Sequence, residues 1–162
     1  MTGARVKPLH RIKRWMYAGN RPNRLSRALN ALSAWQYAHG ILTLGGRGVT
    51  LEVRGRVSGR LVRLPLVLVH MDGNRYLVSM LGTDAQWVRN LYAADGHAIL
   101  HSPRPEQVRL VDVPVDERAP VLKRYLALAP GARPHVPVDR RAPLARFTPI
   151  APEFPVFRVD SA

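Results

Sequence analysis

The sequence predicts a single α+β domain in which short antiparallel strands form a barrel flanked by helices. Three observations lead to this fold class. The chain has 162 residues, which is the size of one domain with a sizeable core. From residue 49 onward, six short segments have the apolar pattern of strands, with turn signals between several of them. Segments with helical spacing precede, separate and follow these strands.

Two helices are expected before the first strand. Residues 9–17 carry apolar side chains at helical spacing with basic residues between them, which predicts a short basic amphipathic helix. A second helix is expected over residues 24–38, ahead of the glycine at position 40. We therefore expect residues 1–40 to form a basic helical segment and residues 41–162 to form the barrel.

The expected strands are joined in part by tight turns. The six segments are 49–54, 61–70, 75–80, 97–101, 106–114 and 155–159. Ser58-Gly59 separates the first two strands, and Asp72-Gly73-Asn74 separates the second from the third. Glycine, aspartate and asparagine tolerate the positive φ angles that tight hairpins need, so two antiparallel hairpins are expected.

Two later helices and a long loop complete the prediction. Asp84 is a candidate N-cap for a helix that reaches about Ala94, and Asp116 for a helix that reaches about Ala129. Residues 130–152 are rich in proline and have no clean period, which indicates an ordered loop or lid.

Positive charge is concentrated in the first part of the chain. The net charge is +14, and residues 1–63 hold 13 of the 25 basic residues but a single acid, Glu52. This asymmetry indicates an anionic partner such as a nucleic acid, a membrane surface or an acidic ligand. The chain has no cysteine, which excludes disulfides, thiolate metal sites and a cysteine nucleophile. No apolar run approaches the roughly 20 residues of a membrane span, and we expect a cytoplasmic protein.

The densest candidate site is the segment 54–63, where four arginines flank a turn with Ser58 and two glycines. The arginines are Arg54, Arg56, Arg60 and Arg63. Guanidinium groups match phosphate geometry, glycine lets backbone N–H groups approach an anion, and the serine hydroxyl is a further donor. The segment therefore predicts an anion site, and an exposed basic hairpin without a ligand is the alternative.

The same segment resembles the signature of the deazaflavin-dependent nitroreductase family. Gly55-Arg56-Val57-Ser58-Gly59 and Arg63-Leu64-Pro65-Leu66 are similar to that family's Gly-Arg-Lys-Ser-Gly and Arg…Pro-Leu. Ser79-Met80-Leu81-Gly82 and Trp87-Val88-Arg89-Asn90-Leu91 follow in the family's order and resemble its Ser-x-x-Gly and Trp-x-x-Asn-Leu. The resemblance extends over residues 40–159 and includes a closing strand at Pro155-Val156-Phe157.

The resemblance implies a homodimeric split β-barrel of the FMN-binding-like kind that binds the 8-hydroxy-5-deazaflavin coenzyme, factor 420. It implies hydride transfer from the reduced coenzyme to a small quinone- or nitro-type acceptor. Arg56, Ser58, Gly59 and Arg60 would contact the phosphate and the oligoglutamate tail. The residues expected at the deazaflavin ring are Ser79, Met80, Leu81, Gly82, Trp87, Arg89, Asn90 and Leu91. Val57 stands where the family has lysine, so either Arg54 or Arg60 replaces that charge or affinity for the tail is reduced.

Other functions stay open at this point. The same barrel could bind deazaflavin, or FMN, as a carrier or sensor without turnover. A nucleic-acid module is disfavoured because aromatic residues make up 7% of the chain and are rare among the arginines. His97 and His101 have a zinc-like spacing but fall in an expected strand, so no metal site is predicted. His135, in the proline-rich loop, is the candidate proton donor, with a surface histidine as the alternative.

The first 24 residues suggest a further partner. Residues 1–24 carry seven basic residues and no acid, together with apolar and aromatic side chains. This composition is typical of a helix that lies in a membrane interface, so contact with an anionic membrane surface is expected. The alternative is that this helix packs on the barrel or across a dimer.

Overall fold

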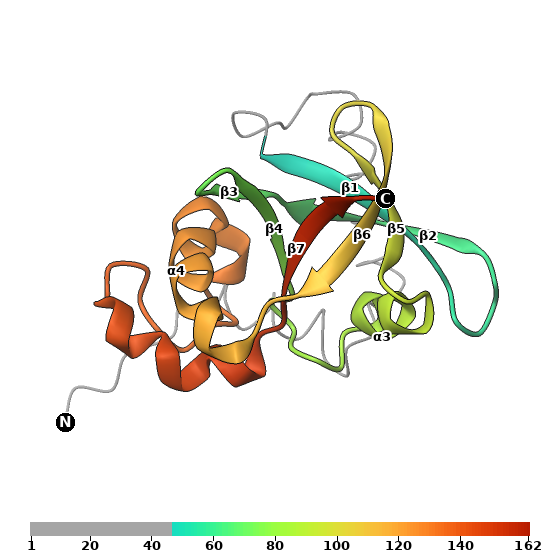
Figure 1. The fold of residues 1–162 in the computed structure, drawn as a ribbon. Coiled ribbons are helices and arrows are strands. Elements are labelled where there is room, and N and C mark those ends of the chain that lie inside the picture. Colours follow the sequence, from blue (N-terminus) through green and yellow to red (C-terminus); the bar gives the residue numbers. More distant parts are fainter. Residues whose placement is uncertain (1–46) are drawn as a thin grey trace.

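The computed structural model describes residues 47–162, and the helices predicted over 9–17 and 24–38 lie outside this range. In the described range seven strands form one sheet (Figure 1). They are β1 (Gly48–Arg54), β2 (Leu61–Val67), β3 (Val69–Met71), β4 (Asn74–Val78), β5 (His97–His101), β6 (Pro105–Asp112) and β7 (Val156–Ser161). Their order is β2-β1-β5-β6-β7-β4-β3, and every neighbouring pair is antiparallel, as predicted.

The two edge strands of the sheet are consecutive in the chain. β2 and β3 stand at opposite ends of the strand order, yet only Leu68 separates them. The sheet must therefore curl until its edges meet, which produces a split barrel. The buried Leu68 marks this junction, and its N–H donates to the carbonyl of Arg47 at 2.7 Å. The single strand predicted over 61–70 is wrong for this reason, because the chain passes from one edge to the other at Leu68.

Both predicted hairpins are present. β1 and β2 pair with Arg54 opposite Leu61, and β3 and β4 pair with Met71 opposite Asn74. Asp72 and Gly73 have φ angles of 51° and 75°, the left-handed values that a two-residue turn of type I′ needs.

Helix α3 (Gln86–Ala93) packs on the inner face of the curled sheet. Alternate residues of β1 point inward and meet Val88 and Leu91 of the helix. The buried residues of this barrel core are Val49, Leu51, Val53, Leu68, Leu77, Ala85, Val88, Leu91, Leu100, Val108, Leu110, Phe157 and Val159. The predicted cap is wrong, because Asp84 makes no capping bond. The helix begins after Ala85, and Asp84 instead pairs with Arg89 at 2.7 Å.

Helix α4 (Arg118–Leu128) lies beside β3, β4 and β7 and forms a second core with them (Figure 1). The predicted cap at Asp116 is wrong, because the 3-10 turn η2 (Val115–Glu117) leads into the helix without a side-chain cap. Arg118 fixes this entry by donating to the carbonyl groups of Val113 (2.8 Å) and Ala151 (3.2 Å).

The segment predicted as an ordered loop over 130–152 packs on α4. It contains three 3-10 helices: η3 (Pro130–Ala132), η4 (Leu144–Arg146) and η5 (Thr148–Glu153). Phe147 is fully buried in the α4 core, and the Lys123 ammonium donates to the carbonyl of Ala142 at 2.9 Å. The segment is therefore anchored along its length. Within residues 47–162, no helix has the length and apolarity to span a membrane.

Candidate functional site

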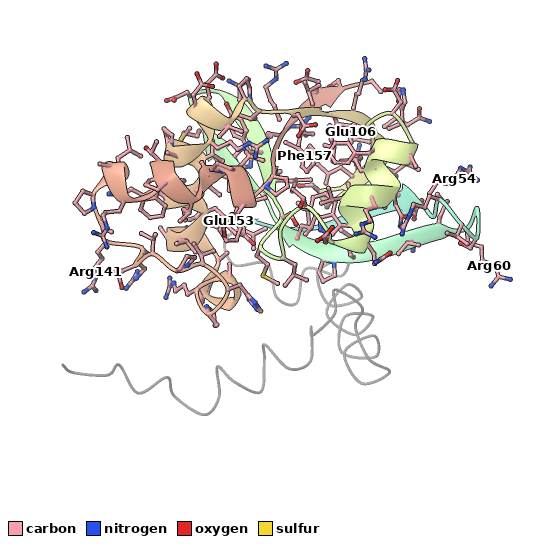
Figure 2. The ribbon with its side chains drawn as sticks, turned by 90° about the horizontal axis from the view of Figure 1, so that it is seen from below. Arg54, Arg60, Glu106, Arg141, Glu153 and Phe157 are labelled. Atoms are coloured by element: carbon pink, nitrogen blue, oxygen red, sulfur yellow. The ribbon has the colours of Figure 1, made fainter. Side chains whose placement is uncertain are left out.

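The β1–β2 hairpin ends in a compact turn that projects beyond the barrel. In Figure 2, Arg54 and Arg60 lie at its tip, far from the α4 layer. Gly55 N–H donates to the carbonyl of Arg60 at 2.7 Å, and Gly59 N–H to that of Gly55 at 2.9 Å. A Cβ at Gly55 would stand 2.7 Å from the Ser58 hydroxyl oxygen, and Gly59 has a φ of 69°. The positive φ of Gly59 is therefore what the turn requires of a glycine, and at Gly55 a side chain would crowd Ser58.

Arg56 joins this turn to helix α3. Its guanidinium donates to Asn90 Oδ1 at 2.8 Å and to Gln86 Oε1 at 3.0 Å, and its backbone N–H donates to the same Asn90 oxygen at 3.1 Å. The Asn90 side chain is buried, so its position is set by the helix. These contacts occupy two of the five guanidinium N–H groups and leave three for a ligand.

The four arginines of the hairpin differ in their partners. Arg63 forms an ion pair with the buried carboxylate of Glu52, which lies directly opposite it on β1. Arg54 donates to the carbonyl of Gly59 at 2.8 Å. Arg54, Arg56 and Arg60 have no acidic partner among residues 47–162. Three positive charges are thus uncompensated within the described chain.

The segment Ser79-Met80-Leu81-Gly82 is a tight turn after β4, where the end of a strand was predicted. Ser79 is buried, and its hydroxyl donates to the carbonyl of Gly82 at 2.7 Å. Met80 packs against the α4 core and Leu81 against the barrel core. The turn therefore stands at the junction of the two cores, with two half-buried apolar side chains.

The predicted residues of α3 have different environments. Leu91 is fully buried in the barrel core, whereas Arg89 is exposed and paired with Asp84. Trp87 is half-buried, and its ring contacts Phe157 edge to face with 5.6 Å between the ring centres. Of these predicted residues, Asn90 contacts the hairpin through Arg56, and Trp87 packs against the barrel core.

The structure brings the hairpin and α3 together through Arg56. In Figure 2, α3 lies between the hairpin tip and Glu153. The backbone of Glu153 also approaches the Ser79–Gly82 turn, because its carbonyl oxygen would be 3.2 Å from a Cβ at Gly82. Gln86, which was not predicted, belongs to this group because it holds Arg56. Gln86 could have been predicted from the sequence, because it lies one helical turn before Asn90 and so shares its face of the helix.

His135 lies in a different part of the fold. Its backbone N–H donates to the carbonyl of Ala132 at 2.9 Å, and the neighbouring Val136 is buried in the α4 core. The structure does not place this histidine beside the hairpin. In residues 47–162, no group of three or more potential metal-binding side chains occurs.

A separate cavity of about 280 Å³ opens at the C-terminal end of α3. It is lined in part by Tyr92, Asp95, Arg109 and Asp112, and shares only Leu91 with the predicted site. Burial, with the 3.0 Å hydrogen bond that Tyr92 donates to Asp112, raises the pKa of Tyr92 to about 12. None of the hairpin arginines lines this cavity. The cavity and the positively charged hairpin are therefore two separate candidate sites.

The chemistry of the hairpin suits an anion. Three uncompensated guanidinium groups surround a turn that is free of acids and contains two glycines and a serine hydroxyl. Such groups make charge-assisted hydrogen bonds to phosphate or carboxylate oxygens. The half-buried side chains of Met80, Leu81 and Trp87 are apolar, which suits a ring system.

Comparison with known proteins is consistent with this geometry. A family model described as F420H(2)-dependent quinone reductase matches residues 33–146. Among proteins of curated function, no sequence matches the chain. A protein of unknown function from Agrobacterium tumefaciens has a similar structure, with 16% identity and a TM-score of 0.52. The match covers 71% of this chain and 48% of that one, so this chain spans about half its length. A structure described as an F420-H2 dependent reductase shows 22% identity and a TM-score of 0.44, covering 70% and 94% of the two chains.

Proposed function

Because the chain belongs to the family of F420H(2)-dependent quinone reductases, we propose that it binds the reduced deazaflavin coenzyme. We further propose that it reduces a small quinone- or nitro-type acceptor. The observation that carries this proposal is the β1–β2 hairpin. Three of its four arginines have no acidic partner in the described residues, and one of these three, Arg56, is fixed on α3 by three hydrogen bonds.

The hairpin would hold the phosphate of the coenzyme. Arg56 retains three N–H groups for phosphate oxygens, and the Ser58 hydroxyl stands in the same turn. Binding at the tail is remote from the reacting ring, so its free energy could orient the ring without touching it. Arg54 and Arg60 flank Val57, and their charges would compensate for the lysine that Val57 replaces.

The ring would rest on the half-buried side chains at the junction of the two cores. Met80, Leu81 and Trp87 have surface available for an apolar contact, whereas the Ser79 hydroxyl and the Leu91 side chain are used within the protein. When bound, the reduced coenzyme supplies two electrons as hydride. The residues of the chain would bind the coenzyme, orient it and exclude water from it.

Absorbance and turnover test the proposal together. Reduced deazaflavin coenzyme is titrated into the protein, and a quinone or a nitroaromatic acceptor is then added. We expect saturable binding followed by reoxidation of the coenzyme that depends on the protein. Failure to bind the coenzyme, or turnover with FMN alone, would contradict the proposal and favour the FMN-binding alternative.

The remaining assignments stay predictions. They are the homodimer, a cytoplasmic location, the absence of a nucleic-acid partner, the division of the chain at residue 40, and contact of residues 1–24 with an anionic membrane.

A further inference from the structure

The cavity at the C-terminal end of α3 has an apolar floor and a polar rim. Its floor consists of three buried apolar residues, Leu91, Leu110 and Phe157. Its rim consists of four exposed residues, Tyr92, Asp95, Arg109 and Asp112. The volume of about 280 Å³ lies just below the range of roughly 300–1,000 Å³ of most small-molecule sites. The cavity therefore suits a molecule with one ring or a short chain and is too small for the coenzyme with its tail.

Two aromatic rings stand at this cavity. Tyr92 and Phe157 contact each other edge to face, with 5.9 Å between the ring centres. Phe157 is buried, whereas Tyr92 is 50% exposed, so the Tyr92 ring has surface left for a ligand. Its hydroxyl donates to Asp112 at 3.0 Å, which fixes the ring at the rim. Aromatic rings pack against the apolar body of a ligand and attract organic cations through their faces.

The two carboxylates of the rim are only loosely paired. Asp95 lies 3.4 Å from a guanidinium nitrogen of Arg109, and Asp112 lies 3.9 Å from one of Arg118. By comparison, two other arginine–carboxylate pairs of the sheet have N–O distances of 2.8 Å. Arg118 instead donates hydrogen bonds to two backbone carbonyl groups. Because a carboxylate can accept about four hydrogen bonds, both aspartates keep acceptor capacity for a further donor.

The rim has the opposite charge to the hairpin. Its ionised residues are two aspartates and one arginine, so their charges sum to −1 in a chain whose net charge is +14. The cavity shares no residue with the basic segment 54–63. An anionic coenzyme is therefore not the ligand that fits this rim. A cation with an apolar body fits both the rim and the floor.

We propose that this cavity is a second binding site, which takes a small organic amine in its protonated form. The ammonium group donates to the carboxylates of Asp95 and Asp112, and it lies beside the ring of Tyr92. The apolar body of the amine packs on the floor formed by Leu110 and Phe157. This site does not depend on coenzyme binding, because its charge and its polar residues are separate from those of the hairpin.

Phenethylamine, which carries an ammonium group two carbons from a benzene ring, is a suitable probe. It is titrated at neutral pH into the full chain labelled with ¹⁵N, and the backbone amide shifts are followed by NMR. We expect saturable shifts at Gly96 and Asp112, with a Kd on the order of 1 mM. The uncharged analogue 2-phenylethanol should bind at least about threefold more weakly, and the anionic analogue 3-phenylpropionate should give no saturable shift.

The carboxylates are tested by the double variant Asp95→Asn/Asp112→Asn. It keeps the side-chain shapes and an oxygen for the Tyr92 hydroxyl, and asparagine tolerates the φ of 51° at position 95. Phenethylamine should bind roughly fivefold or more weakly to this variant, because each exposed ion pair contributes at most severalfold. Asp72→Asn is the matched control, since Asp72 is also exposed, has the same φ of 51° and does not line the cavity.

Three results would overturn the proposal. The first is the absence of saturable shifts at the cavity. The second is equal affinity for phenethylamine and 2-phenylethanol, which would show that the site is merely apolar. The third is a double variant that binds phenethylamine as tightly as the Asp72→Asn control does.

Discussion

At the residue scale, the amide oxygen of Asn90 connects helix α3 to the hairpin. It accepts one hydrogen bond from the backbone and one from the guanidinium of Arg56. Because Asn90 is buried and Arg56 is exposed, the helix determines where the arginine lies. Asn90 is thus a positioning residue, and Arg56 is the group that would meet the phosphate.

Replacing Asn90→Leu should weaken coenzyme binding by roughly tenfold, since it removes two hydrogen bonds that orient a charged group. The double variant Asn90→Leu/Arg56→Ala should bind no more weakly than Arg56→Ala alone, because both changes disable the same arginine. Binding is followed by fluorescence titration, with Gln107→Leu as an exposed control. Additive losses in the double variant would show that Asn90 acts independently of Arg56.

Single residues also show which contacts can be predicted from the local sequence and which cannot. The basic turn and its glycines were predictable because motif residues and turn chemistry are local. The pairing of Arg63 with Glu52 follows from the hairpin register and could have been derived from the predicted strands. The contact between Arg56 and Asn90 joins residues 34 positions apart, and no local periodicity carries that information.

At the scale of elements, the turn that joins α3 to β5 depends on Gly96. Its φ is 79°, its N–H donates to the carbonyl of Leu91 at 2.9 Å, and its own carbonyl accepts from Leu110 N–H at 2.8 Å. A Cβ there would stand 2.6 Å from the backbone oxygen of Leu110. The backbone at this point leaves no space for a side chain.

Gly96→Ala should therefore lower the free energy of unfolding by roughly 1–3 kcal/mol or more, through strain at positive φ and the clash with Leu110. Gly131→Ala is the matched control, because beyond its own stretch of chain no heavy atom lies within 4 Å of its Cβ position. Urea denaturation measures both variants. Equal stability of the two variants would contradict the close approach at Gly96.

An ion pair connects the first residues of β6 with β4. The Arg75 guanidinium donates to both carboxylate oxygens of Glu106 at 2.8 and 2.9 Å, and the Ser161 hydroxyl donates to one of them at 3.0 Å. The hydrogen bonds from Arg75 hold the pKa of Glu106 below its ordinary value of 4.5. The ionised form is thus favoured in the folded chain.

The stabilisation from Glu106 is complete above the unfolded pKa near 4.5 and is lost as the pH falls through the lower folded value. Glu106→Gln should therefore be less stable than the wild type at neutral pH, and this difference should shrink in acid below the unfolded pKa. Denaturation midpoints at neutral and acid pH measure it. A difference that stays constant with pH would show that the charge of Glu106 does not matter.

Predictions of strands and turns were accurate where they depended on neighbouring residues. They failed where the structure depends on the closing of the sheet into a barrel. The Asp72-Gly73 turn and the strands on either side of it were predictable from turn chemistry. The break at Leu68 was not, because it arises when the two edges of the sheet meet. The caps predicted at Asp84 and Asp116 failed because each helix is entered through a backbone turn that other contacts hold.

At the scale of the molecule, the curled sheet places α3 and α4 on different cores and leaves the hairpin projecting. The antiparallel barrel was predictable from strand periodicity, and its assignment as a split barrel from motif order. The positions of the motifs relative to one another depend on the closed sheet. Closure brings α3 into contact with the hairpin and sets the Ser79–Gly82 turn at the junction of the two cores.

The most direct test of the hairpin as a phosphate site compares two deazaflavins that differ only in the phosphorylated tail. Each is titrated into the wild type, into Arg56→Ala and into the control Arg141→Ala. The wild type and the control should bind the phosphorylated form at least about tenfold more tightly, and Arg56→Ala should lose most of this preference while binding the tail-free form equally well. Equal affinity of the wild type for both forms, or a preference that Arg56→Ala leaves intact, would contradict the phosphate site.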